Sequence, residues 1–297
     1  MTPKTQLTTF VGVPIDSTGH PNGLERMPQA LRDAGLLEQL EIQDSGDLPV
    51  TIEPPVRDPA TGIIGYESVC RTSKIIRDNL RNLLTQGKRP LVAGGCCTLL
   101  IGVFAALRQQ YGRVGLAFVD GHLDFYDGQS SPTGEAADME LAILTGFGPS
   151  ELSNLAGVSP LVAAQDVVVL GYRDAEEARQ AGALDPQTVA PAMTLVDAQA
   201  LKHGNRSRLG AQVASRFEAE PQRFWLHLDL DVLDQSVLPA VDYRMPNGLH
   251  WEELAELVRP LTHSPALVGA DITIYNPALD RDGYYAKQIV TWLAAIL

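Results

Sequence analysis

The chain has 297 residues, of which 36 are acidic and 23 basic, so its formal net charge at pH 7 is −13. This balance argues against a nucleic-acid-binding surface and favours cationic ligands or metal ions. No apolar run reaches the roughly 20 residues of a membrane span, and the amino terminus lacks the apolar segment of a secretory signal. Three cysteines, two of them adjacent, fit a reducing compartment. We therefore expect a cytoplasmic protein that binds neither membranes nor nucleic acids.

The first part of the chain alternates apolar runs with helical patterns. Proline near the start and glycine at the end predict a helix over 28–35, and helical spacing of apolar residues predicts another over 66–84. Residues 45–47 are predicted to form a turn, and 48–63, rich in proline, aspartate and glycine, a surface loop. The predicted strands are 9–14, 41–44, 90–95 and 114–119, and a third helix is predicted over 98–110.

The second part continues this alternation as far as a closing helix over 284–296. Further strands are predicted at 166–170, 193–196 and 266–274, together with a strand-like run that begins at 224 and ends in aspartates. Strands that alternate with helices indicate βαβ units, and hence a mostly parallel sheet covered on both faces. No convincing linker interrupts the chain. We expect a single domain spanning 1–297.

Candidate metal ligands follow the buried run 114–119. In an extended backbone, Asp120, His122 and Asp124 would project toward the same side. Two carboxylates and an imidazole suit a divalent cation such as manganese or zinc. The pattern therefore predicts a metal site at the end of this strand.

A second acidic cluster, Asp229 and Asp231 with Asp234 beyond them, ends the strand-like run from 224. A single Asp-x-Asp pair commonly forms a turn or a helix cap. Two clusters at the carboxyl ends of parallel strands, however, meet where such sheets bind ligands. Four aspartates brought together without a cation would repel one another, so a metal centre is the favoured interpretation.

Together, Asp120-Gly121-His122-Leu123-Asp124 and the run 229–234 resemble the two main metal motifs of the ureohydrolase family, the arginases and agmatinases. The resemblance extends, in the right order, to 12–14, 28–35, 94–95, 171–174 and 271–277. It implies an arginase/deacetylase-like fold, an α/β three-layer αβα sandwich with a mostly parallel sheet of about eight strands. It also implies hydrolysis of a guanidinium group to urea and an amine, and assembly into homo-oligomers, trimers or hexamers.

The resemblance further implies a cofactor of two Mn²⁺ ions. Asp120 and Asp229 would bridge them, and a hydroxide held between them would attack the guanidinium carbon. Cys97 stands where the family has a histidine ligand of the first metal. Because thiolate is a softer ligand than imidazole, the site at Cys97 could hold Zn²⁺ or Fe²⁺ instead. Alternatively, it could bind its ion so weakly that the protein keeps only one ion. The implied metal ligands are Cys97, Asp120, His122, Asp124, Asp229 and Asp231.

The residues that read the substrate in relatives are altered in this chain. Ile274 stands where the family has a glutamate that pairs with the guanidinium, and Ala137 where arginases have a proton-shuttling histidine. Acidic residues nearby could compensate by binding a cationic substrate or transferring protons. The catalytic candidates are Glu135, Asp138 and Asp234, the last resembling an aspartate that orients a neighbouring group, and the substrate-binding candidates are Tyr126, Thr133 and Glu176.

Several of these residues also have purely structural interpretations. Glu135 and Asp138 would suit the first turn of a helix, where acids favour the positive end of the dipole, and Glu176 would suit a solvent-exposed helix. His227 shares one side of its strand with Asp229, but the apolar run around it favours a buried, hydrogen-bonded core histidine. Surface-loop roles are slightly favoured for Asp242 and Tyr243.

Three functions fit these patterns. The leading hypothesis is a metal-dependent hydrolase of C–N bonds in a small, cationic guanidino, hydroxyguanidino or amidino compound. The second is a mononuclear metallo-amidase or deacetylase that uses His122, Asp229 and a neighbouring carboxylate. The third is a non-catalytic family member that binds metal for stability or for ligand sensing.

Overall fold

The computed structural model describes residues 6–297, in which eight strands form one sheet with every neighbouring pair parallel. The strand order is β2-β1-β3-β8-β7-β4-β5-β6. The strands are β1 Thr9–Val13, β2 Gln43–Asp47, β3 Pro90–Gly94, β4 Gly115–Val119, β5 Val167–Leu170, β6 Thr194–Val196, β7 Phe224–Asp229 and β8 Leu267–Thr273.

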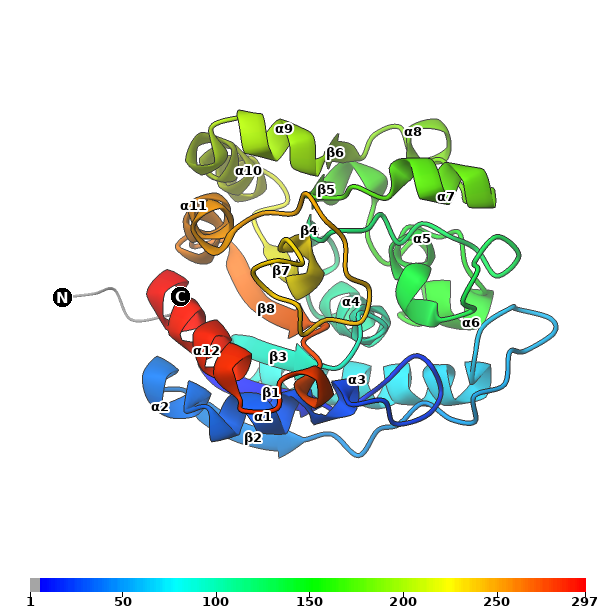
Figure 1. Cartoon of the computed structure of the whole chain (residues 1–297). Helices are drawn as coiled ribbons and strands as arrows, with labels where there is room; N and C mark the ends of the chain where they lie inside the picture. The colour runs from blue at the N-terminus through cyan, green and yellow to red at the C-terminus, as the bar shows by residue number, and fades with distance from the viewer. Residues whose placement is uncertain (1–5) are drawn as a thin grey trace.

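Helices cover both faces of this sheet (Figure 1). On one face α10, α11, α12, α1 and α2 pack side by side, and on the other α3, α4, α5 and α6 do so. This arrangement confirms the predicted three-layer αβα architecture. The helices are α1 Met27–Asp33, α2 Leu36–Leu40, α3 Tyr66–Thr85, α4 Leu99–Tyr111, α5 Glu140–Leu144, α6 Ser150–Ser153, α7 Ala175–Ala181, α8 Pro186–Val189, α9 Ala198–His203, α10 Arg206–Ala219, α11 Trp251–Thr262 and α12 Tyr284–Ile296.

The central strands are buried along nearly their whole length, as near-continuous apolar runs require in a parallel sheet. Every residue of β3, β4 and β7 is buried. The strands β3, β8, β7 and β4 are consecutive in the sheet and parallel. Their carboxyl ends therefore lie side by side at the centre of the molecule. Within residues 6–297, no helix combines the length and apolar composition needed to cross a membrane.

The prediction for the second strand is partly wrong. The strand begins at Gln43 rather than at residue 41 and includes Ser45, Gly46 and Asp47, which were expected to form a turn. This strand lies at the edge of the sheet, where one side is open and polar residues are tolerated. A register irregularity in its pairing with β1, together with φ +77° at Gly46, accommodates the turn-forming residues.

Candidate metal centre

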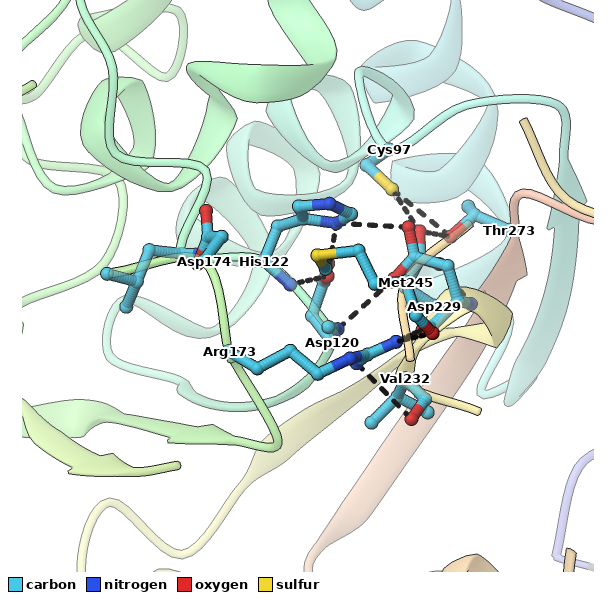
Figure 2. Close-up of polar contacts among 12 residues, drawn as sticks. Cys97, Asp120, His122, Arg173, Asp174, Asp229, Val232, Met245 and Thr273 are labelled. Carbon is cyan, nitrogen blue, oxygen red and sulfur yellow. Dashed lines mark hydrogen bonds and ion pairs between the residues drawn. The ribbon is translucent and has the colours of Figure 1, made fainter. Parts of the chain in front are cut away.

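The four consecutive strand ends carry most of the candidate ligands. Cys97 follows β3, Asp120 follows β4 and Asp229 ends β7, so side chains distant in sequence lie together (Figure 2). This is the edge at which parallel α/β sheets bind ligands.

The backbone after β4 is not extended, contrary to the prediction. Oδ1 of Asp120 accepts a hydrogen bond of 2.7 Å from the backbone N–H of His122, which turns the chain directly after the strand. Asp124 then adopts a left-handed φ of +46°. The corresponding turn after β7 has Oδ1 of Asp229 accepting from the N–H of Asp231 at 2.7 Å, within the short 3₁₀-helix Leu230–Val232. Local carboxylate turns, rather than strand alternation, therefore bring these side chains together.

Three groups of side chains each offer ligand atoms within 4.8 Å of one another. Asp120 belongs to all three, which makes it the residue best placed to serve more than one ion. Cys97 belongs to two. The groups are Cys97, Asp120, Asp124 and Glu140; Cys97, Asp120, His227 and Asp229; and Asp120, His122 and Asp231.

Cys97 is held against Asp229 in the metal-free protein. Its Sγ donates to Oδ2 of Asp229 at 2.7 Å and lies 3.2 Å from Oγ1 of Thr273, which also donates to that Asp229 oxygen, at 3.0 Å. Burial, and then the neighbouring charge of Asp229, raise the pKa of the Cys97 thiol well above its ordinary value. Without a cation Cys97 is therefore a thiol, and a metal ion would have to displace its proton.

His122 lies on the other side of Asp120, and its Nδ1 is 3.0 Å from Oδ2 of Asp231. Burial alone would lower the pKa of His122, but the charge of Asp231 and contacts with Asp120 outweigh burial and raise it. For Asp120, burial acts to raise the pKa, yet the neighbouring His122 and His227 together lower it. The two imidazoles thus offset the burial of this carboxylate.

His227 is fully buried, and its Nδ1 is 2.6 Å from Oδ2 of Asp271, as expected for a core histidine. Its other nitrogen faces the metal candidates, with Nε2 3.4 Å from Oδ2 of Asp120. The sequence interpretation therefore identified the burial of His227 but not its contact with the centre.

Several atoms of the centre are buried without any hydrogen-bond partner among the described residues: Asp120 Oδ2, His227 Nε2 and both carboxylate oxygens of Glu140. A buried polar group without a partner is costly, and a buried carboxylate especially so. Carboxylate oxygen, imidazole nitrogen and cysteine sulfur are all donors to divalent cations. The residues present therefore fit a metal centre.

A cavity of about 130 Å³ opens onto these ligands. Most of the candidates from the sequence line it, whereas Asp120 lies deeper, only 1% exposed. The candidates that line the cavity are Cys97, His122, Asp124, Tyr126, Thr133, Glu135, Asp138, Asp229 and Asp231, and Ile274 and Ala137 lie in the same wall.

Besides Asp120, two further candidates do not line this cavity. Glu176 is exposed on α7 and binds Arg179 and Gln180, whereas its neighbour Glu177 lines the cavity. Asp234 accepts hydrogen bonds from Ser236 within its own loop. The structure thus brings neither carboxylate to the site.

Glu135 directly precedes the 3₁₀-helix Ala136–Asp138, and Asp138 is its last residue, yet both line the cavity. Glu135 accepts a 2.5 Å hydrogen bond from Ser17 Oγ and a 2.6 Å hydrogen bond from Tyr243 OH. Oδ2 of Asp138 accepts from Thr133 Oγ1 at 2.7 Å, whereas its Oδ1 is buried without a partner among the described residues. Burial raises the pKa of Asp138 to about 6.

Sequence reasoning missed three residues around the ligands. Glu140 belongs to the centre itself, although its position within α5 gave no motif to identify it. Asp174 lines the cavity and accepts from the Leu123 N–H at 3.0 Å, which ties the ligand loop after β4 to α7. Arg173 donates to the backbone carbonyls of Asp231 and of residues beyond it (Figure 2).

Comparisons with known proteins agree with this arrangement. A model of the arginase family matches residues 7–297. The arginase of Brevibacillus brevis is 28% identical over 294 residues, which cover 97% of this chain and 96% of the relative. The solved arginase of Bacillus caldovelox superposes with a TM-score of 0.85 at 25% identity, over 98% of this chain and 97% of its own. The agmatine ureohydrolase of Thermoplasma volcanium shares the fold, with a TM-score of 0.69 at 20% identity over 99% of this chain and 89% of its own.

Proposed function

The chain belongs to the arginase family and is a metal-dependent hydrolase of C–N bonds in a guanidino compound, and from this premise we propose how its own site acts. Two Mn²⁺ ions would occupy the centre. Asp120 would help to hold them, together with the groups that contain Cys97 and the group that contains His122. The membership of Asp120 in all three groups is the observation that carries the proposal.

Bound divalent cations would lower the pKa of a water molecule and so supply a nucleophile near neutral pH. The chain's own residues would do the remaining work. The buried floor of the cavity would limit access of bulk water, and its walls would hold the substrate against the ligands. Asp138 lines the cavity, and its Oδ1 has no hydrogen-bond partner among the described residues. It would take the proton that the attacking water loses and donate it to the departing amine.

The charge of the cavity supports a cationic substrate. Among the described residues that line it there is no lysine or arginine. The carboxylates that line it are Asp124, Glu135, Asp138, Asp174, Glu177, Asp229 and Asp231. A guanidinium or amidinium group is planar and cationic, and it pairs well with carboxylates.

Ile274 alters how that cation would be held. It is buried in the cavity wall and offers no charge where the family has a glutamate. We propose that Glu135 supplies the negative charge that Ile274 lacks. Hydrogen bonds from Ser17 and Tyr243 hold its two carboxylate oxygens in place. Thr133 and Tyr126 would complete the substrate pocket.

Product release tests this function directly: urea or hydroxyurea from guanidines and hydroxyguanidines, and ammonia from amidines. The manganese-loaded protein would be incubated with alkylguanidines, hydroxyguanidines and amidines, each with and without a carboxylate group. We expect turnover of at least one cationic guanidine, loss of that turnover in Asp229→Asn, and retention in Glu176→Gln, whose carboxylate lies outside the cavity. Product formation no greater than in the metal-free protein across the whole panel would contradict the proposal.

Counting bound ions separates the two-ion enzyme from a mononuclear amidase or deacetylase. Two tightly bound manganese ions per chain would support the first, and a single ion with turnover of simple amides would support the second. Metal binding without turnover on either class of compound would indicate the non-catalytic alternative.

We further propose that residues 1–297 form a single domain, because one sheet takes strands from β1 through β8. The three cysteines are unpaired and buried, which supports a reducing, cytoplasmic location. A homo-oligomer, trimeric or hexameric, is proposed from the family resemblance, and light scattering of the purified protein would measure it.

A further inference from the structure

We propose that Glu140 is a ligand of the metal ion beside Cys97, an addition to the ligands that the two aspartate motifs supply. The proposal rests on metal binding by the site, and therefore on the proposed function. It concerns a residue that no motif in the sequence indicates.

The burial of Glu140 is the first observation. The residue is 0% exposed, and neither of its carboxylate oxygens has a hydrogen-bond partner among the described residues. A carboxylate in such a place loses its hydration without replacement, which costs several kcal/mol unless a cation or a proton compensates. Glu140 therefore needs either a cation or a proton beside it, and its neighbour Asp124 is itself a carboxylate.

The neighbours of Glu140 favour a cation. A carboxylate oxygen of Glu140 and ligand atoms of Cys97, Asp120 and Asp124 all lie within 4.8 Å of one another. An ion with ligand distances of about 2.0–2.3 Å could contact several atoms spaced in this way. The group offers one sulfur and three carboxylates, and Oδ2 of Asp120 is also buried without a hydrogen-bond partner among the described residues.

The backbone holds this arrangement in place. Glu140 is the first residue of α5. Two residues further along this helix, the N–H of Ala142 donates to the carbonyl of Asp124 at 3.4 Å. The segment before the helix is tied to the same loop, because the N–H of Tyr126 donates to the carbonyl of Asp138 at 3.2 Å. These bonds fix α5 against the loop of Asp124, so the two carboxylates approach each other as a consequence of the fold.

The donor count gives Glu140 a chemical role. Cys97 replaces an imidazole in this family, and a buried thiol whose proton is shared with Asp229 is a poorer donor at neutral pH than imidazole. The carboxylate of Glu140 would add a strong, hard donor to this group of ligands. The group would then suit manganese better than the same ligands without Glu140. The main alternative is a proton shared between Glu140 and Asp124, with no metal contact.

Manganese binding by Glu140→Gln distinguishes these possibilities. Glutamine keeps the shape of the side chain and removes its charge. We expect manganese titration of the metal-free protein, followed by equilibrium dialysis, to show at least a tenfold weaker affinity for one of two ions. The melting temperature of the metal-free protein should rise, because carboxylate repulsion is relieved, whereas the rise in melting temperature on adding manganese should shrink. Glu176→Gln, the same chemical change on exposed α7, should alter neither quantity.

A purely structural glutamate would behave differently. Equal losses of melting temperature with and without manganese, or wild-type affinity for both ions in Glu140→Gln, would overturn the ligand role while leaving the proposed function intact. Failure of the wild-type protein to bind manganese would overturn both. If Glu140→Gln does not fold, anomalous scattering from manganese-loaded wild-type crystals decides, since an ion beyond about 3 Å from both Glu140 oxygens is not bound by them.

Discussion

Nε2 of His227 lies 3.4 Å from Oδ2 of Asp120, and neither atom has a hydrogen-bond partner among residues 6–297. The other side of the imidazole is fixed, because Nδ1 is 2.6 Å from Oδ2 of Asp271 and the Trp225 indole donates to the second oxygen of that carboxylate. With the Asp271 carboxylate as the acceptor of this bond, Nδ1 of His227 is the donor. This aims Nε2 at the centre, as carboxylates commonly orient the histidines of metal sites.

His227→Phe should destabilise the metal-free protein by about 3–5 kcal/mol, because Asp271 is left buried with one uncharged partner. The ring would still stack near Phe118, whose centroid lies 4.7 Å from that of the imidazole, so packing alone should change little. Urea unfolding would measure the loss. Asp271→Asn in the same chain should recover most of it, and equal destabilisation in the single and double variants would show that Asp271 is not the cause.

Cys97 offers a test of metal selectivity. Cys97→His should strengthen the binding of manganese relative to that of zinc, because imidazole suits both ions whereas thiolate favours zinc, the softer ion. Cys97→Ser should weaken the binding of zinc more than that of manganese, because it replaces the sulfur ligand with a hydroxyl, which is a weak donor to metal ions. Competition between the two ions, read by elemental analysis after dialysis, gives the ratio for each variant. An unchanged ratio in both would mean that Cys97 contacts no ion.

The fold was largely predictable because its strands carry a strong local signal. β4 and β7 are apolar runs that end in acidic residues, and the parallel arrangement follows from the helices between them. β2 was misplaced because Ser45 and Gly46 favour turns in isolation, and only pairing with β1 makes them a strand. Edge strands depend on such tertiary contacts more than central strands do.

The site was predictable only where ligands sit close together in sequence. Asp120 and Asp229 belong to compact motifs, but Glu140 reaches the centre through the path of α5, which no spacing rule describes. The sequence analysis predicts Glu176 as a substrate-binding residue, whereas Glu177, the next residue on α7, lines the cavity. A single sequence does not fix the rotation of this helix, because both residues are charged and helix-compatible.

Arg173 should hold the loop after β7 in one conformation. Its guanidinium donates to the carbonyls of Asp231 at 2.7 Å and Pro246 at 3.1 Å, joining two parts of that loop. Arg173→Lys keeps the charge but not the planar fork. We expect faster hydrogen exchange over residues 231–249 and weaker binding of one ion, with no such change in Arg179→Lys on exposed α7. Exchange at the wild-type rate would show that the loop is held by other contacts.

Asp174 should make stability fall as pH rises. Burial, with a smaller contribution from the charge of Asp120, raises the pKa of Asp174 to about 6, from 3.8 for an unperturbed aspartate. Between these values the folded state binds more protons than the unfolded state, so the free energy of unfolding decreases with rising pH and levels off above about 7. A shift of about two units corresponds to roughly 3 kcal/mol.

Asp174→Asn removes this ionisation while its amide oxygen still accepts from the Leu123 N–H. The metal-free variant should therefore exceed the metal-free wild type in stability by about 1–3 kcal/mol at pH 7.5, and the difference should shrink as pH falls toward 4. Urea unfolding of both proteins at a series of pH values measures this. The comparison cancels the titrating groups that do not interact with Asp174, so a difference that is independent of pH, or that grows in acid, would contradict a raised pKa of the Asp174 carboxyl.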